Sequence, residues 1–139
     1  MSLVLDASLT LSWYFEDERT PALDVVLDEV VARGAVVPSL WRMEVANGFQ
    51  MAIRRKRVDT DFRDRAIQHL GSLPIVVDQE SDTYAWTAML RLSDRFGLTV
   101  YDATYLELAQ RRNLPLASID KALSVAGQRL GVPIFGRKT

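Results

Sequence analysis

Four acidic residues of this chain could together bind a metal ion. They are Asp6, Glu44, Asp102 and Asp120, and each follows an apolar segment or lies within an apolar face. A carboxylate buried in such surroundings costs several kcal/mol unless a positive charge compensates it. Mg²⁺ and Mn²⁺ are hard cations that prefer oxygen ligands and retain water, so carboxylates suit them. The residue types therefore predict a divalent-cation site.

Each of the three aspartates also has a simpler interpretation. An Asp directly before a helix often accepts a backbone hydrogen bond as an N-cap, which could explain Asp6, Asp102 and Asp120 one at a time. Glu44 is a poor capping residue and is expected in the second turn of its helix. Its alternative is an inward salt bridge with an arginine. The candidate arginines are Arg63, Arg65 and Arg91.

Short runs rich in Val, Leu and Ile alternate with longer segments of helical period. This alternation is typical of an α/β domain with a mostly parallel sheet. Strands are predicted at residues 2–6, 35–37, 74–77, 115–118 and 132–135. A short helix is predicted after Asp6, and further helices over residues 21–33, 40–56, 60–70, 81–96, 102–112 and 120–129.

The predicted elements bring the four acids together. Ligand sites of open parallel sheets form beyond the carboxyl ends of the strands, where Asp6 and Asp120 are expected. Glu44 lies on an apolar stripe of its helix, and Asp102 shares a helix face with Tyr105. Both of these acids should therefore point toward the interior or a cleft in it.

The composition limits the class of protein. The 139 residues are 48% hydrophobic and 25% charged, as expected for a single domain with an apolar core. Lys plus Arg total 17 against 18 Asp plus Glu, so binding of a polyanion has to use local basic patches. The absence of cysteine excludes disulfides, thiolate nucleophiles and zinc sites with Cys ligands. Because a charge follows three apolar residues at the N-terminus, we expect neither a signal peptide nor a membrane span, and a cytoplasmic protein.

Several other mechanisms lack the residues that they need. His69 is the single histidine, which excludes a metal-free ribonuclease with two catalytic histidines, and we expect it on the surface near a helix end. The sequence contains no nucleophile elbow for a Ser-His-Asp triad and no Gly-rich phosphate loop. A carboxylate-held cation is therefore the chemistry that the sequence favours.

One dense basic run could contact a polyanion. It consists of Arg54, Arg55, Lys56 and Arg57, at the predicted end of the helix that carries Glu44. These cations could bind phosphate groups, although cations at a helix C-terminus also offset the helix dipole. The same two interpretations apply to the pair Arg111 and Arg112.

Aromatic residues offer a further means of binding a nucleobase. Trp13, Tyr14 and Phe15 follow the Asp6 segment and could stack against a base. Apolar residues of a short helix more often pack in the core, which is the alternative interpretation. Trp41 and Trp86 occur at helical spacing with other apolar residues and are predicted in the core or a dimer interface.

Four segments resemble the motifs of PIN-domain ribonucleases, specifically the VapC toxins of bacterial and archaeal toxin–antitoxin pairs. They are Leu3-Val4-Leu5-Asp6-Ala7-Ser8, Pro38-Ser39-Leu40-Trp41-Arg42-Met43-Glu44-Val45-Ala46-Asn47, Tyr101-Asp102-Ala103-Thr104-Tyr105-Leu106 and Leu116-Ala117-Ser118-Ile119-Asp120-Lys121-Ala122-Leu123. They occur in the family's order and spacing over essentially the whole chain. The resemblance implies one PIN-like domain over residues 1–139, folded as a three-layer α/β/α sandwich around a mostly parallel sheet.

The resemblance also implies an activity and partners. The activity is that of an endoribonuclease toxin that hydrolyses RNA phosphodiester bonds with Mg²⁺ or Mn²⁺. The partners are a VapB-like antitoxin that occupies the active-site groove and a second copy of the chain in a homodimer. Asp6 and Asp102 would be the main metal ligands, Glu44 a further ligand directly or through water, and Asp120 a more peripheral acid.

Three polar residues near these acids could support the site. Ser8 and Ser118 could hydrogen-bond a carboxylate or a phosphate, and helix capping is their alternative role. Asn47 lies one turn after Glu44, at a position that tends to be Asn in the family. It could orient a carboxylate, or it could be a surface amide.

Two other functions compete with this hypothesis. A catalytically weak PIN-like binding module could act mainly in a repressor complex with the antitoxin. A phosphotransfer receiver domain also gathers acids around Mg²⁺ at strand ends. It would require two adjacent acids after the first strand, whereas Ala7 and Ser8 follow Asp6 in this chain.

Overall fold

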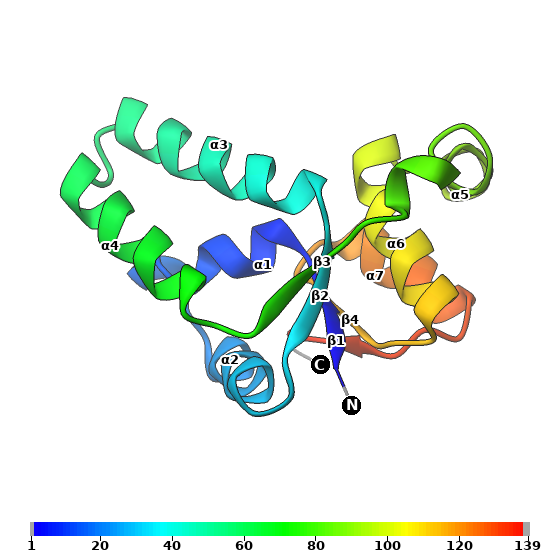
Figure 1. Ribbon diagram of the computed structural model, residues 1–139, viewed down its shortest axis with the longest axis horizontal. Helices are drawn as coiled ribbons and strands as arrows, with labels where there is room; N and C mark the ends of the chain where they lie inside the picture. Colours follow the sequence, from blue (N-terminus) through cyan, green and yellow to red (C-terminus); the bar gives the residue numbers. More distant parts are fainter. Residues whose placement is uncertain (1, 138–139) are drawn as a thin grey trace.

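The protein is described by a computed structural model over residues 2–137, in which strands and helices alternate along the chain (Figure 1). The strands are β1 (Leu3–Leu5), β2 (Ala35–Pro38), β3 (Ile75–Asp78), β4 (Leu116–Ala117) and β5 (Ile134–Phe135). The α-helices are α1 (Ala7–Ser12), α2 (Pro21–Arg33), α3 (Leu40–Arg54), α4 (Thr60–Gly71), α5 (Ala88–Phe96), α6 (Val100–Arg112) and α7 (Lys121–Arg129). Two 3-10 helices, η1 (Glu16–Glu18) and η2 (Ser81–Tyr84), precede α2 and α5.

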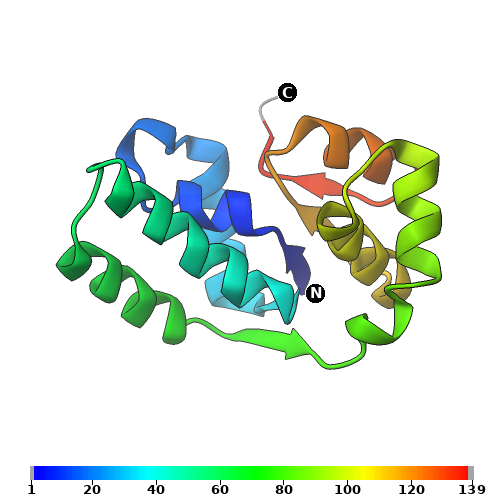
Figure 2. The same cartoon turned by 90° about the horizontal axis from the view of Figure 1, so that it is seen from above.

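The strands of residues 2–137 form one five-stranded, all-parallel sheet with the order β3-β2-β1-β4-β5. Helices α1 to α4 cover one face of the sheet and α5 to α7 cover the other, as Figure 1 and Figure 2 show from two directions. The central strand β1 is buried from both sides. This arrangement confirms the predicted three-layer sandwich. None of the helices in the described residues is both long and apolar enough to cross a membrane.

The helix that the sequence predicts over residues 81–96 is divided into two parts. The hydroxyl of Ser81 donates to Asp78 at 2.9 Å and anchors the start of η2 at the sheet. Before α5 begins, Thr87 has a non-helical backbone, with φ −122° and ψ −92°. Trp86 lies in the connecting turn and is 89% exposed, so of its two predicted locations the core is wrong and the dimer interface stays a prediction. Trp41, by contrast, is buried as predicted.

Helix α6 begins two residues before the predicted position. Its N-cap is Thr99, whose hydroxyl oxygen accepts a hydrogen bond from the backbone N–H of Asp102 at 3.1 Å. Asp102 therefore lies in the first turn of the helix, and the interpretation of Asp102 as an N-cap is wrong. Helix α3 also ends before the predicted Lys56, which has a left-handed backbone with φ 58°.

A buried ion-pair network joins the edge strand β3 to helix α6. The Asp78 carboxylate is fully buried and accepts hydrogen bonds from Arg111 Nη2 at 2.8 Å and Arg112 Nη2 at 2.7 Å. Arg111 Nε also donates to Glu107 at 2.7 Å. Burial raises the pKa of Asp78, but the hydrogen bonds from the two arginines and Ser81 bring it well below its ordinary value. Neither sequence interpretation of Arg111 and Arg112 included this structural role.

Replacement of Asp78 by asparagine tests this network. We expect Asp78→Asn to lower the free energy of unfolding by about 3 kcal/mol near neutral pH, because the arginines lose their buried counter-charge. The depressed pKa means that Asp78 contributes fully above the ordinary pKa of its carboxyl group. The contribution is lost as the pH falls below about 4, so the difference from wild type should shrink on acidification.

Urea unfolding measures both effects, and Asp94→Asn on the exposed surface of α5 serves as the control. Equal unfolding free energies for wild type and Asp78→Asn at neutral pH would contradict a stabilising network.

Candidate active site

Asp6 lies at the carboxyl end of the central strand β1 and is the most buried of the four acids, with 4% of its surface exposed. Its Oδ2 accepts hydrogen bonds from the hydroxyls of Ser8 and Ser118, both at 2.8 Å. Asp6 occupies the N-cap position of α1, but its side chain makes no capping hydrogen bond, so capping does not account for the carboxylate. Among the described residues no donor bonds its Oδ1, which leaves this oxygen available to a ligand.

Asp120 begins α7 and is the one aspartate of the three for which the N-cap interpretation is correct. Its Oδ1 accepts a hydrogen bond from the backbone N–H of Leu123 at 2.7 Å. The backbone N–H of Asp120 donates to Ser118 Oγ at 3.0 Å. Ser118 therefore connects Asp120 to Asp6 across the ends of the neighbouring strands β1 and β4.

Glu44 is half-buried in the second turn of α3 and pairs with a tyrosine. The hydroxyl of Tyr105 donates a hydrogen bond to Glu44 Oε1 at 2.5 Å. Within residues 2–137 Glu44 forms no salt bridge with any of the three candidate arginines, and Arg63 pairs with Asp64 instead. Sequence reasoning missed this contact, although Tyr105 follows Asp102 by three residues and shares its helix face.

The four acids form one electrostatically coupled cluster. Burial is the main cause that raises the pKa of Asp6, of Glu44 and of Asp102 above their ordinary values. Repulsion adds to this effect. Asp102 raises the pKa of Asp6, both of these acids raise the pKa of Glu44, and Asp120 raises the pKa of Asp102. The cluster is therefore short of positive charge.

The carboxylates lie near one another without enclosing a common point. In the part of the chain that the structure describes, no group of three or more Asp, Glu, His or Cys side chains is arranged to hold an ion by itself. A cation at this position would complete its coordination with water, which Mg²⁺ and Mn²⁺ retain readily. The donor set of carboxylate oxygens and the unrelieved negative charge both fit such a cation.

The packing of α3 against α1 brings Glu44 to the Asp6 end of the sheet. Trp41 Nε1 donates to Thr10 Oγ1 at 3.0 Å, and the Thr10 hydroxyl donates to the backbone carbonyl of Asp6 at 2.9 Å. Gly48, one turn after Glu44, permits the close approach because a Cβ there would overlap a leucine side chain of α1.

Several other candidates lie outside the cluster. Asn47 is exposed, and its amide makes no hydrogen bond within residues 2–137, so it fits the surface-amide interpretation. His69 is exposed near the end of α4, as predicted, and its Nδ1 hydrogen-bonds the hydroxyl of Tyr14 at 2.6 Å. Trp13 and Phe15 are buried in the core, as expected for apolar residues next to a short helix.

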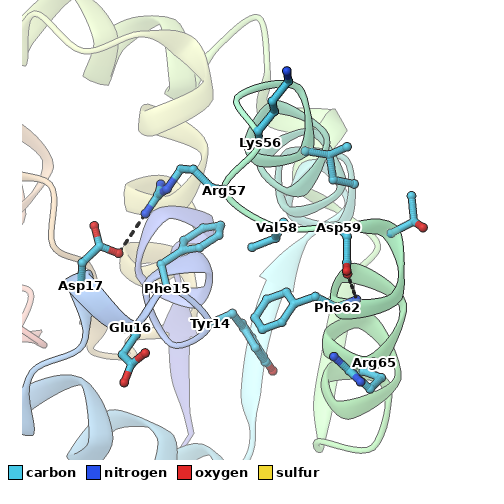
Figure 3. A pocket seen from close by; sticks show the side chains of 12 residues that line it. Tyr14, Phe15, Glu16, Asp17, Lys56, Arg57, Val58, Asp59, Phe62 and Arg65 are labelled. Atoms are coloured by element: carbon cyan, nitrogen blue, oxygen red, sulfur yellow. Dashed lines mark hydrogen bonds and ion pairs between the residues drawn. The ribbon is translucent and has the colours of Figure 1, made fainter.

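Two residues of the basic run, Lys56 and Arg57, line a cavity of about 910 Å³ at the far end of α3 (Figure 3). Arg57 Nη2 donates to Asp17 at 2.9 Å and to Glu18 at 3.1 Å, and its guanidinium lies 4.5 Å from the centre of the Phe15 ring. Arg57 therefore holds the η1 segment. The other members of the run are exposed and form no ion pair within residues 2–137. They are Arg54, Arg55 and Lys56.

The chain is similar to proteins of known family along nearly its whole length. A family model described as the PIN domain matches residues 3–128. Ribonuclease VapC3 of Pyrobaculum aerophilum is 27% identical over 124 residues, which cover 89% of this chain and 93% of that protein.

Solved structures share the fold. PAE2754 from Pyrobaculum aerophilum has a TM-score of 0.70 at 23% identity, and the aligned region covers 96% of this chain and 83% of the PAE2754 chain. A toxin–antitoxin complex from Klebsiella pneumoniae has a TM-score of 0.62 at 18% identity, covering 99% of this chain and 97% of its own. FitAcB from Neisseria gonorrhoeae has a TM-score of 0.64 at 13% identity and covers 96% of both chains. Because the family model spans most of the sequence, the chain belongs to the PIN domain family.

Proposed function

We propose that this PIN domain protein is a metal-dependent endoribonuclease and the toxin of a type II toxin–antitoxin pair. The observation that carries the proposal is the cluster of buried, mutually repelling acids at one end of the sheet, in a chain of this family. The relative named Ribonuclease VapC3 supports nuclease activity on RNA. The structural neighbour described as a toxin–antitoxin complex supports a protein partner.

Asp6 and Asp102 are the proposed direct ligands of a divalent cation, Mg²⁺ or Mn²⁺. Glu44 binds it directly or through water, and Asp120 is peripheral because its Oδ1 already caps α7. When bound, the cation supplies Lewis acidity for the in-line attack of water on an RNA phosphodiester. Ser8 and Ser118 oppose the rise in the pKa of Asp6 by donating to Oδ2, and so help to keep this ligand ionised.

The proposal includes partners and a location. A VapB-like antitoxin would cover the acids, and a second copy of the chain would form a homodimer in the cytoplasm. Trp86, which is 89% exposed, is the residue that we expect to find buried in that dimer. Arg54, Arg55 and Lys56 are the proposed contacts to RNA phosphates, whereas Arg57 is engaged within the protein.

Cleavage of RNA by the purified protein tests the proposed activity. We expect cleavage with Mg²⁺ or Mn²⁺, none with EDTA, and a loss of about 100-fold or more in kcat/KM for Asp6→Asn, because the amide removes a charged ligand. Asp28→Asn on the exposed face of α2 should cleave like wild type.

Cleavage that survives both the chelator and Asp6→Asn would contradict the metal-carboxylate mechanism. A wild-type protein that binds an antitoxin but cleaves no RNA with either metal would instead favour the catalytically weak binding module.

The unfolding temperature of the metal-free protein tests the repulsion in the cluster. A carboxyl group with a raised pKa binds its proton more tightly in the folded state, so the stability of the protein falls as the pH rises through that pKa. Asp102→Asn removes one such charge. In EDTA near neutral pH we therefore expect Asp102→Asn to unfold at a higher temperature than wild type.

Added Mn²⁺ should reverse this order, because a ligand that binds only the folded protein raises its stability and the variant lacks a ligand group. Thermal unfolding followed by circular dichroism gives both results. A variant that is less stable in EDTA and gains as much from Mn²⁺ as wild type would exclude Asp102 from the metal site.

The salt dependence of RNA binding tests the basic run. In the inactive Asp6→Asn background, the added triple substitution Arg54→Ala, Arg55→Ala and Lys56→Ala should weaken binding. It should also reduce the slope of log Kd against log salt concentration by up to about 2, since each phosphate contact to a single strand contributes about 0.7. The matched control replaces three other exposed arginines with alanine. They are Arg33, Arg91 and Arg129. An unchanged slope in the first variant would remove the run from the RNA-binding surface.

A further inference from the structure

The hydroxyl of Tyr105 occupies an unusual place for a polar group. Tyr105 is the largest of the fully buried side chains, with 0% of its surface exposed, and a phenylalanine would supply the same apolar ring to the core. A buried hydroxyl is costly unless it is hydrogen-bonded. Within the described residues, the hydrogen-bond partner of the Tyr105 hydroxyl is Glu44, a member of the acidic cluster.

This partner lies on another element of the sandwich. The hydroxyl donates to Glu44 Oε1 on α3 at 2.5 Å. Because Tyr105 belongs to α6, the bond connects two helices that cover opposite faces of the sheet.

We propose that Tyr105 is a positioning residue of the carboxylate site, which fixes Oε1 of Glu44 and leaves Oε2 for the divalent cation. This inference rests on the proposed function and assigns a role that acts through Glu44 alone. Tyr105 itself contacts neither metal nor substrate.

The same arrangement occurs at Asp6. There two serine hydroxyls donate to Oδ2, and no donor within the described residues bonds Oδ1. Asp6 is buried at the end of a strand, whereas Glu44 has a longer side chain and lies half-exposed on a helix. A Glu side chain has more rotamers than an Asp side chain and loses more conformational entropy when it binds a cation. A hydrogen bond that fixes one oxygen of Glu44 in advance therefore lowers the entropic cost of binding more than it would at Asp6.

The position of Tyr105 on α6 also suits a positioning role. Tyr105 and the proposed ligand Asp102 lie three residues apart on one face of α6. Helix α6 thus carries the proposed ligand Asp102. Through Tyr105 it also orients the proposed ligand Glu44, which belongs to α3 on the other face of the sheet. Removal of the hydroxyl should free Glu44 while Asp102 and the buried ring stay in place.

Mn²⁺ binding measured without RNA tests the proposal. Electron paramagnetic resonance reports the free Mn²⁺ concentration, and we expect Tyr105→Phe to bind Mn²⁺ about tenfold or more weakly than wild type, as for other residues that orient a ligand. The matched control is Tyr101→Phe on the same helix, because Tyr101 is 62% exposed, and its affinity should equal that of wild type. In a Glu44→Ala background, Tyr105→Phe should cause no further loss.

Three results would overturn the proposal. The first is an unchanged Mn²⁺ affinity in Tyr105→Phe while Asp6→Asn loses binding. The second is a loss in Tyr105→Phe that persists at full size in the Glu44→Ala background, which indicates a general effect on packing. The third is a wild-type protein that binds no Mn²⁺, or that binds Mn²⁺ no more tightly than Asp6→Asn does. In that case the carboxylates hold no cation, and the proposed function is refuted together with the role of Tyr105.

The wild-type protein supplies a second measurement that does not depend on the folding of a variant. In tyrosine-labelled protein, the hydroxyl proton of Tyr105 should give a protected NMR resonance, because its bond to Glu44 is buried. The protection should persist when Mg²⁺ is added. Loss of the resonance on Mg²⁺ binding would show that the hydrogen bond breaks in the loaded site and would refute the positioning role.

Discussion

The acidic cluster is arranged around one carboxylate that is buried at the end of the central strand. Asp6 is 4% exposed, and burial is the main cause of its raised pKa. An apolar residue would be less costly at this position, so the sequence retains a group that opposes folding of the metal-free protein. Such a loss of stability is what the proposed cation site leads us to expect. The two serines that donate to Asp6 offset part of this cost, and the neighbouring acids increase it.

The elements around Asp6 fix the other acids in place. Helix α3 is attached to α1 by the contact between Trp41 and Thr10, which sets the position of Glu44. Helix α6 is held at both ends. Near its N-terminus it contributes Asp102 and Tyr105 to the acidic cluster, and near its C-terminus Arg111 binds the buried Asp78. Arg111, which lies far from the acidic cluster, thus helps to fix the position of the helix that carries Asp102 and Tyr105.

Local sequence signals predicted the alternation of strands and helices, and the resemblance to PIN domains predicted the three layers, whereas long-range contacts could not be predicted. The bounds of α2 matched because its start at Pro21 and its end at Gly34, with φ 81°, are both marked by residue type. Thr99 lies three residues before Asp102, at the spacing of an N-cap, but an aspartate near the same helix end gives a competing capping signal. The contact between Tyr105 and Glu44 spans 61 residues, and no local spacing reports such a pair. Asp78 ends a strand, but its partners Arg111 and Arg112 lie 33 and 34 residues further along the chain, and no local spacing reports these contacts either.

The proposed mechanism requires that the acids at the end of β1 hold a divalent cation. The most direct measurement is anomalous diffraction from a crystal of the protein soaked in Mn²⁺, with data collected above the manganese absorption edge. The expected result is an anomalous peak within coordination distance of Asp6 and Asp102, with Glu44 bonded to it directly or through one water. A peak elsewhere in the molecule, or none near these acids in a protein that cleaves RNA with Mn²⁺, would contradict the claim.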